Sequence, residues 1–210
     1  QRFQVKSGFM AGKLGVFASA SQNQQDGFRA QSAMKQTTLN LKLRYQLSED
    51  AKLSLLFNYG NSPYAQDPGG LTAEQVVSDR RQARTANVQF NGGEEVSQGR
   101  VGLVFEKQFS VKHRLTARGF VTRRDFANRL AFLGGGWVEF QRNFGGLEIN
   151  YLYTSGQYRS QLGLEWNDQR DNRQRYNNES GQRGALTFDQ IERFRSVGAF
   201  WLNELTLGKK

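Results

Sequence analysis

The chain has 210 residues and no cysteine, which excludes disulfide bonds and thiolate chemistry by its own side chains. Its 29 lysines and arginines outweigh 19 aspartates and glutamates, and the formal net charge of +10 makes nucleic-acid binding a class to consider. The arginines are scattered, however, and no zinc-finger, homeodomain or RNP pattern accompanies them. No run reaches the roughly 18 apolar residues that a transmembrane helix requires.

The chain is expected to begin with two strands, over residues 2–10 and 14–21, with a short turn between them. Residues 22–35 are polar and are expected to form a loop. Residues 38–59 then read as an antiparallel hairpin around a short turn at 48–52. This hairpin has the clearest pattern in the chain, and the interpretation of the fold depends on it.

The two faces of the expected hairpin are unlike each other. In its first arm Leu41 and Leu43 alternate with Lys42 and Arg44, and the second arm resumes the apolar side. Alternation with period two is typical of a β-strand. Each arm has roughly the 9 to 11 residues that a tilted strand needs to cross a bilayer, with its cations facing away from the apolar side. A transmembrane barrel fits this pattern.

After the hairpin, expected strands alternate with long polar connections. Residues 60–86 are irregular, contain both prolines of the chain, and include a short expected helix over 71–78. The remaining expected elements are strands over 99–109, 115–122, 147–153, 158–167 and 193–205, a loop over 123–146 with a short strand near 137–141, and a polar loop over 168–184. The total is about nine strands of membrane length.

The expected connections alternate in length. Those after residues 10, 47, 109 and 153 are short, and those after residues 21, 59, 122 and 167 are long. Outer-membrane barrels have short periplasmic turns and long extracellular loops, whereas a soluble sandwich or lipocalin has no reason to keep this asymmetry. The sequence therefore predicts an all-β, antiparallel transmembrane β-barrel. Because an odd number of strands does not close a bacterial single-chain barrel, residues 1–210 are expected to be one segment of a larger barrel.

A series of short motifs, in order along nearly the whole chain, resembles one family. Asp26-Gly27-Phe28-Arg29 comes first, residues 65–72 (AQDPGGLT) follow the hairpin, and residues 162–166 (LGLEW) and 184–187 (GALT) lie further on. The series resembles the early barrel of TonB-dependent outer-membrane receptors, which take up siderophores and ferric chelates. The resemblance implies a barrel of about 22 strands with an N-terminal plug domain in its lumen, energised through TonB.

The resemblance also implies the setting of the chain. Residues 1–210 would be part of one receptor barrel domain in the outer membrane of a Gram-negative bacterium, with the plug domain and the C-terminal barrel strands outside this sequence. The expected partners are outer-membrane lipid and lipopolysaccharide, the receptor's own plug, the TonB complex, and a ferric siderophore or other anionic chelate, but not nucleic acid. Iron is expected only within the chelate, and no covalently bound cofactor is expected.

Catalysis has little support in the sequence. His113 is the only histidine, and it falls in an expected periplasmic turn, so that neither a histidine-based triad nor a histidine-rich metal site is available. Glu94 and Glu95 are adjacent, and neighbours on an extended strand point to opposite sides. We therefore expect no enzyme, no catalytic residue and no resident metal.

Binding is the better hypothesis, because many arginines fall in segments expected to be extracellular loops. Guanidinium groups suit carboxylate and phosphate oxygens, although contacts to lipopolysaccharide phosphates or plain solvation are competing roles. The expected ligand-binding residues are Arg29, Tyr64, Arg80, Arg81, Arg84, Arg123, Arg124, Arg170 and Arg173, with Arg175, Phe28 and Tyr176 nearby. The charged residues expected to face the lumen and meet the plug are Lys42, Arg44, Arg118 and Glu148.

The expected function is therefore that of an outer-membrane receptor segment, which binds and imports a ferric siderophore or similar anionic chelate with TonB-driven gating. Two alternatives remain open at this point. One is a small complete outer-membrane barrel acting as a porin or adhesin. The other is a soluble basic β protein that binds nucleic acid, which requires the leucines of the strands to share a dry core.

Overall fold

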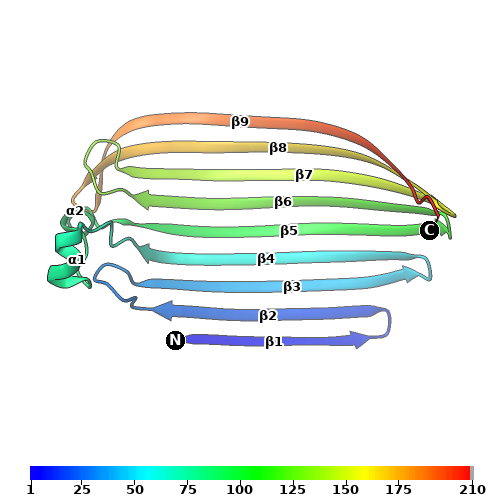
Figure 1. The fold of residues 1–210 in the computed structure, drawn as a ribbon, viewed down its shortest axis with the longest axis horizontal. Helices are drawn as coiled ribbons and strands as arrows, with labels where there is room; N and C mark the ends of the chain where they lie inside the picture. Colours follow the sequence, from blue (N-terminus) through cyan, green and yellow to red (C-terminus); the bar gives the residue numbers. More distant parts are fainter. Residues whose placement is uncertain (209–210) are drawn as a thin grey trace.

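A computed structural model describes residues 1–208, which form one antiparallel sheet of nine strands and two short helices. The strands lie side by side in sequence order (Figure 1). Their bounds are β1 (Arg2–Ala11), β2 (Leu14–Gln25), β3 (Met34–Ser48), β4 (Ala51–Gln66), β5 (Gly93–Ser110), β6 (His113–Arg129), β7 (Trp137–Ser155), β8 (Tyr158–Glu179) and β9 (Gln182–Leu205). The helices are α1 (Ala73–Asp79) and α2 (Thr85–Gln89), and the expected count of nine strands is confirmed.

The register of the strands divides the sheet into two unlike faces. We call them the Leu41 face and the Lys42 face, after two neighbouring residues of β3. Leu41 pairs with Phe57 of β4, which pairs with Val101 of β5, so that apolar residues of successive strands line up in one row. Since residues alternate between faces, Lys42 and Arg44 lie on the opposite side. The hairpin pattern predicted from the sequence thus extends over the whole sheet.

The large apolar side chains of the Leu41 face do not pack into a core. Leu103 and Leu164, for example, are 46% and 52% exposed. The only hydrophobic residue buried within residues 1–208 is Ala51. A soluble fold requires these side chains to be removed from water, so the soluble alternative does not fit this structure.

The apolar band on the Leu41 face slopes across the rows of paired residues. The row that contains Tyr59 of β4 already reaches a charged residue, Arg123, on β6. The next row on the same face contains Leu41, and from Ser7 of β1 onward it becomes charged only at Asp168 of β8 and Arg195 of β9. Strands that are tilted relative to a membrane produce this slope, because the band stays level while the rows run obliquely.

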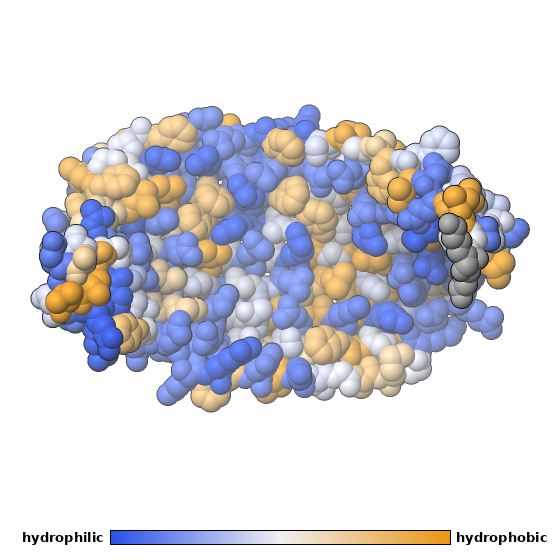
Figure 2. Space-filling view, viewed as in Figure 1, coloured by the Kyte–Doolittle hydropathy of each residue, from blue (hydrophilic) through white to orange (hydrophobic). Residues whose placement is uncertain are grey.

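Both edges of the sheet are open within residues 1–208, since β1 pairs only with β2 and β9 only with β8. The face seen in Figure 2 is hollowed along its middle and carries hydrophilic side chains with smaller hydrophobic patches between them. Across residues 1–208, neither helix has the length and apolar character needed to cross a membrane.

The prediction of a loop over residues 168–184 is wrong. β8 continues to Glu179 and β9 begins at Gln182, with a two-residue turn at Ser180 and Gly181. Both turn residues have positive φ, 51° and 87°, as in the tight turns favoured by hairpins. Alternation failed as a signal because this part of the hairpin is polar on both faces. The predicted long connection after residue 167 is therefore absent.

The predicted loop over 123–146 is also mostly strand. β6 continues to Arg129 and β7 starts at Trp137, leaving a connection of residues 130–136. The helix expected over 71–78 is confirmed as α1, whose first turn is closed by a capping box between Thr72 and Gln75. Both helices lie in the connection between β4 and β5, at the end of the sheet opposite the β1–β2, β3–β4, β5–β6 and β7–β8 turns (Figure 1).

Candidate functional site

Five arginines gather on the Lys42 face near the end of the sheet that carries the β2–β3, β4–β5 and β6–β7 connections, which we call the long-loop end. We call these five residues the arginine cluster. The register places Arg124 of β6 beside Arg142 of β7, which pairs in turn with Asp171 of β8. The full set is Arg100, Arg124, Arg142, Arg173 and Arg175. Because every member comes from a strand, the sheet fixes their relative positions.

Arg124 lies against aromatic rings. Its guanidinium carbon is 5.4 Å from the ring centroid of Phe126 and 5.8 Å from that of Phe140. The two rings stack on each other at 4.8 Å. The Arg124 Nε atom is buried, and no acceptor for it exists in residues 1–208. Aromatic faces stabilise a cation, but they do not satisfy an N–H donor, so the Arg124 Nε has no hydrogen bond within residues 1–208.

Two members of the cluster are neutralised by carboxylates. Arg142 donates from Nε and Nη2 to both oxygens of Asp171, at 2.8 and 2.6 Å, and the Asp171 residue is only 2% exposed. Arg173 donates from Nη1 to both oxygens of Glu192, at 3.0 and 3.1 Å. These pairs cross from strand to strand and hold the polar end of the sheet together.

The other three members have no carboxylate partner within the part of the chain that the structure describes. Arg100 donates to the Thr122 hydroxyl at 3.1 Å and lies 4.8 Å from the Phe120 ring centroid. Arg124 and Arg175 form no ion pair. The arginine cluster therefore keeps an excess of positive charge, with Arg124 half-buried and Arg100 and Arg175 exposed.

Arg29, whose expected role in ligand binding stays a prediction, connects two loops. It donates from Nε to the Gln82 carbonyl at 2.9 Å, from Nη1 to the Gly69 carbonyl at 2.7 Å, and from Nη2 to the Pro68 carbonyl at 3.1 Å. With these donors engaged by backbone oxygens, the side chain fixes the β2–β3 loop against the β4–β5 connection. The structure thus gives Arg29 a structural role.

The other loop arginines cover the same junction. The guanidinium carbons of Arg80 and Arg81 lie 5.8 and 5.5 Å from the Phe28 ring centroid, and Arg81 Nε donates to the Phe28 carbonyl at 3.3 Å. Arg84 is the residue that precedes α2, and its side chain makes no cap hydrogen bond. The loop positions expected for these three residues are confirmed, while their role in ligand binding stays a prediction.

The remaining expected binding residues are not in loops. Arg123 and Arg124 lie on β6, and Arg170 and Arg173 lie on β8, whereas Tyr64 lies on β4. By register, Arg123 and Arg170 belong to the Leu41 face, and Arg124 and Arg173 to the Lys42 face. The expected set is therefore split between two opposite surfaces. Arg142 was missed because it fell within the loop expected over 123–146. Arg100 lay on an expected strand, over 99–109, and was missed because only loop arginines were considered as binding residues.

The residues expected to face the lumen do share the Lys42 face. Arg118 pairs with Glu148 in the register, and its Nη1 lies 2.8 Å from the Glu148 Oε1 atom. Lys42 and Arg44 lie on the same face nearer the other edge. These four residues lie nearer the β3–β4 and β5–β6 turns than the arginine cluster does. Their expected contact with a plug stays a prediction.

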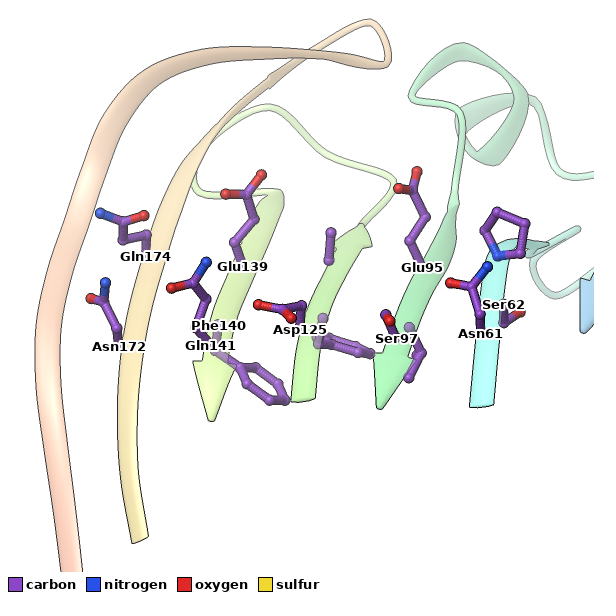
Figure 3. A pocket seen from close by; sticks show the side chains of 14 residues that line it. Asn61, Ser62, Glu95, Ser97, Asp125, Glu139, Phe140, Gln141, Asn172 and Gln174 are labelled. Carbon is purple, nitrogen blue, oxygen red and sulfur yellow. The ribbon is translucent and has the colours of Figure 1, made fainter. Parts of the chain in front are cut away.

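Beyond the apolar band, the Leu41 face is polar as well. Figure 3 shows its side chains from neighbouring strands beside a hollow of about 490 Å³. The row contains Asn61, Ser97, Asp125, Gln141 and Asn172, and Glu95 and Glu139 lie in the next row. The sheet at this end is thus polar on both sides, as expected for strands that continue past the hydrocarbon into water.

No protein-family model matches the chain. Among solved structures, the ferric citrate transporter FecA superposes over 99% of this chain and 32% of its own, with a TM-score of 0.84 and 20% identity. The ferric-catecholate import receptor Fiu from E. coli K12 superposes over 98% of this chain and 37% of its own, with a TM-score of 0.63 and 12% identity. The ferric preacinetobactin receptor BauA from Acinetobacter baumannii gives the same coverages, with a TM-score of 0.61 and 11% identity.

These neighbours are TonB-dependent receptors. The chain has the fold of a TonB-dependent receptor barrel segment. It spans about a third of the length of the receptors that it matches. The fold belongs to the outer membrane of Gram-negative bacteria, in agreement with the location expected from the sequence. The neighbours are transporters and receptors and not enzymes.

Proposed function

We propose that residues 1–210 form part of the barrel wall of an outer-membrane receptor that binds and imports a ferric siderophore or a similar anionic ferric chelate. The receptor-barrel fold supports this proposal, as do the ligands for which the neighbouring structures are named, which are ferric citrate, a ferric catecholate and ferric preacinetobactin. The observation that carries the choice of an anionic ligand is the excess of positive charge in the arginine cluster, where Arg100, Arg124 and Arg175 form no ion pair within residues 1–208.

The proposed chemistry is binding and passage without the making or breaking of covalent bonds. Iron enters as cargo within the chelate, and no covalently attached cofactor takes part. The Arg124 guanidinium, held against Phe126 and Phe140, donates to a carboxylate or catecholate oxygen of the chelate. A plug domain and the TonB complex would supply the gating, and Arg44 and Arg118 on the lower part of the Lys42 face are the residues that we assign to the plug.

The test compares two adjacent arginines in the complete natural protein that contains this chain. Arg124→Gln removes a cation from the Lys42 face, and Arg123→Gln removes one from the Leu41 face of the same strand. Ferric citrate and a ferric catecholate serve as probes, with affinity measured by fluorescence quenching and import by radioactive iron uptake.

We expect Arg124→Gln to weaken binding of the preferred probe by roughly ten- to a hundredfold, because a charge-assisted hydrogen bond contributes about 1.5–3 kcal/mol. Arg123→Gln is expected to bind like the unmodified protein. If both variants bound the ferric chelate with the same affinity, the arginine cluster would not be part of the binding site. Failure of every ferric chelate tested to bind the unmodified protein would contradict the proposed function itself.

A further inference from the structure

Hydrogen bonds from three separate parts of the long-loop end meet at residues 90–92 of the β4–β5 connection, which we call the Asn91 junction. In the β2–β3 loop, Gln31 Nε2 donates to the Asn91 Oδ1 atom at 3.0 Å. From the end of β6, Arg129 Nε donates to the Asn91 carbonyl at 3.0 Å. From β8, Asn178 Nδ2 donates to the first carbonyl of the junction at 2.9 Å. One short segment thus contacts residues that lie up to 88 positions away in sequence.

The junction is closely packed. Asn91 has a φ of 50°, and the Gly92 N–H donates to the Asn87 carbonyl at 2.7 Å, so that the β4–β5 connection also holds the junction from within. The β8–β9 turn approaches so closely that a Cβ atom added at Gly181 would lie 2.8 Å from the Asn91 Cβ atom. The Arg129 side chain is only 10% exposed. The contacts at the junction are therefore largely removed from water.

The contacts continue from the junction in both directions. Toward β2, the Ala30 N–H donates to the Arg81 carbonyl at 2.7 Å, in the region where Arg29 also connects the β2–β3 loop to the β4–β5 connection. Toward β7, the Asn178 N–H donates to the Leu133 carbonyl of the β6–β7 connection at 2.8 Å. Each of the four connections at the long-loop end, the β8–β9 turn included, is therefore joined to at least one other.

We propose that these four connections form one cooperative unit, which is assembled without a ligand and opens only as a whole. Opening of the β4–β5 connection alone leaves the Arg129 Nε and the fully buried Asn178 amide each short of an acceptor, which is unfavourable for buried donors. When the neighbouring connections move as well, water reaches these groups, so opening together is favoured. The rim formed by this segment is thus a single fixed structure and not a set of independently moving lids.

The test measures hydrogen exchange of backbone amides by mass spectrometry, on the complete natural protein in phospholipid bilayers without ligand. Arg129→Met removes the donor to the junction. Arg183→Met is the matched control. Arg183 also forms an ion pair, with Glu139 at 3.2 Å, and also lies over an aromatic ring, but its hydrogen bonds within residues 1–208 do not reach the four connections. Exchange is followed at two amides whose own hydrogen bonds do not involve Arg129, those of Ala30 and Asn178.

We expect Arg129→Met to speed exchange at Ala30 and at Asn178 by the same factor, about tenfold or more, because one opening exposes both amides. Arg183→Met is expected to leave both rates unchanged. Faster exchange confined to residues 90–92 would overturn the proposal, and so would different factors at the two amides. Since no ligand takes part, the result is independent of whether the proposed chelate binds.

A second variant approaches the unit from its other end, and it decides the matter if Arg129→Met does not fold. Gln31→Asn shortens the side chain that reaches Asn91, and asparagine tolerates the φ of 55° at this position. We expect faster exchange at the Asn178 amide, on the far side of the junction. Acceleration limited to the β2–β3 loop would show that the connections open separately and would contradict the proposal.

Discussion

The side-chain amide of Asn178 donates a hydrogen bond to the backbone carbonyl of Phe90, 2.9 Å away and 88 positions earlier in the chain. The same nitrogen donates to the Leu130 carbonyl at 2.9 Å, and the amide oxygen accepts from the Gly181 N–H at 2.8 Å. Asn178 has no exposed surface. One buried side chain thus joins the β4–β5 connection, the β6–β7 connection and the β8–β9 turn.

Asn178→Ala should loosen all three connections at once. The substitution removes the partner of the Phe90 carbonyl and of the Gly181 N–H, whereas the Leu130 carbonyl keeps the Phe132 N–H at 2.8 Å. We expect this to lower the free energy of unfolding by about 1–3 kcal/mol. Urea unfolding in phospholipid bilayers measures the loss, and limited proteolysis reads the opening of the β4–β5 connection. Asn177→Ala is the control, because its side chain accepts only one long bond, from Gly135 N–H at 3.4 Å. Equal protease sensitivity of the two variants would contradict this role.

Leu41→Arg and Lys42→Leu test the assignment of the two faces. We expect Leu41→Arg to block or impair membrane insertion, because a cation facing mid-bilayer lipid costs on the order of 2–4 kcal/mol. Lys42→Leu should insert almost normally, since that side chain points to the other face. The yield of folded protein in the membrane fraction measures both. If the two substitutions behaved alike, the faces would have been assigned incorrectly.

Arg29→Lys should release the β2–β3 loop although it keeps the charge. A lysine is a point donor and does not reproduce the planar fork that reaches the carbonyls of Pro68, Gly69 and Gln82. We expect faster proteolysis within the β4–β5 connection and a free energy of unfolding lower by about 1–2 kcal/mol. Arg84→Lys, in the same connection, serves as the control. A ligand-affinity change without any change in proteolysis would favour the binding role first expected for Arg29.

Asp171→Asn tests the ion pair that braces β7 against β8. Because the Asp171 side chain is 3% exposed and the Arg142 side chain 34%, the loss leaves a guanidinium that water reaches only in part. We expect the free energy of unfolding to fall by about 1–3 kcal/mol. Glu192→Gln, whose side chain is 37% exposed in its pair with Arg173, should cost less, about 0.2–1 kcal/mol. The reverse order would show that burial is not what gives the Asp171 pair its strength.

Asp50, in the turn between β3 and β4, gives a pH-dependent prediction. Hydrogen bonds from Lys107 and Ser48, both at 2.6 Å, hold the pKa of the Asp50 carboxyl below its usual value. A lowered folded-state pKa contributes stability above the unfolded value, near 4, and that contribution disappears as the pH falls through the folded value. Asp50→Asn should therefore lower Tm at neutral pH and match the unmodified protein in acid. A Tm difference independent of pH would contradict this.

The faces of the sheet were predictable because hydrocarbon imposes them. Where a strand crosses a bilayer, one side has to be apolar, and Leu41 and Lys42 record this in adjacent positions of the sequence. Past the bilayer the constraint ends, since water meets both sides. Residues of β8 such as Arg170 and Arg173 were therefore mistaken for a loop, although they continue the strand.

The roles of individual arginines were less predictable than the strands. Arg29 contacts residues that lie about 40 or more positions away in sequence, and no local pattern reveals such a contact. The placement of Arg123 and Arg124 on opposite faces could have been predicted, because consecutive residues of any extended segment point to opposite sides. It was missed once the segment had been interpreted as a loop.

The strands grow from 12 residues in β2 to 22 in β8, a difference of roughly 30 Å at about 3.3 Å per residue. At the end that carries the β4–β5 connection, the wall is therefore lower around β2 and higher around β8. Down the tall side the register sets the order of the guanidinium groups, with Arg175 first, then Arg173, then Arg142 and Arg124, and Arg100 deepest. The unequal strand lengths therefore spread the five guanidinium groups over four successive rows of one wall, and the three that form no ion pair within residues 1–208 lie in three different rows.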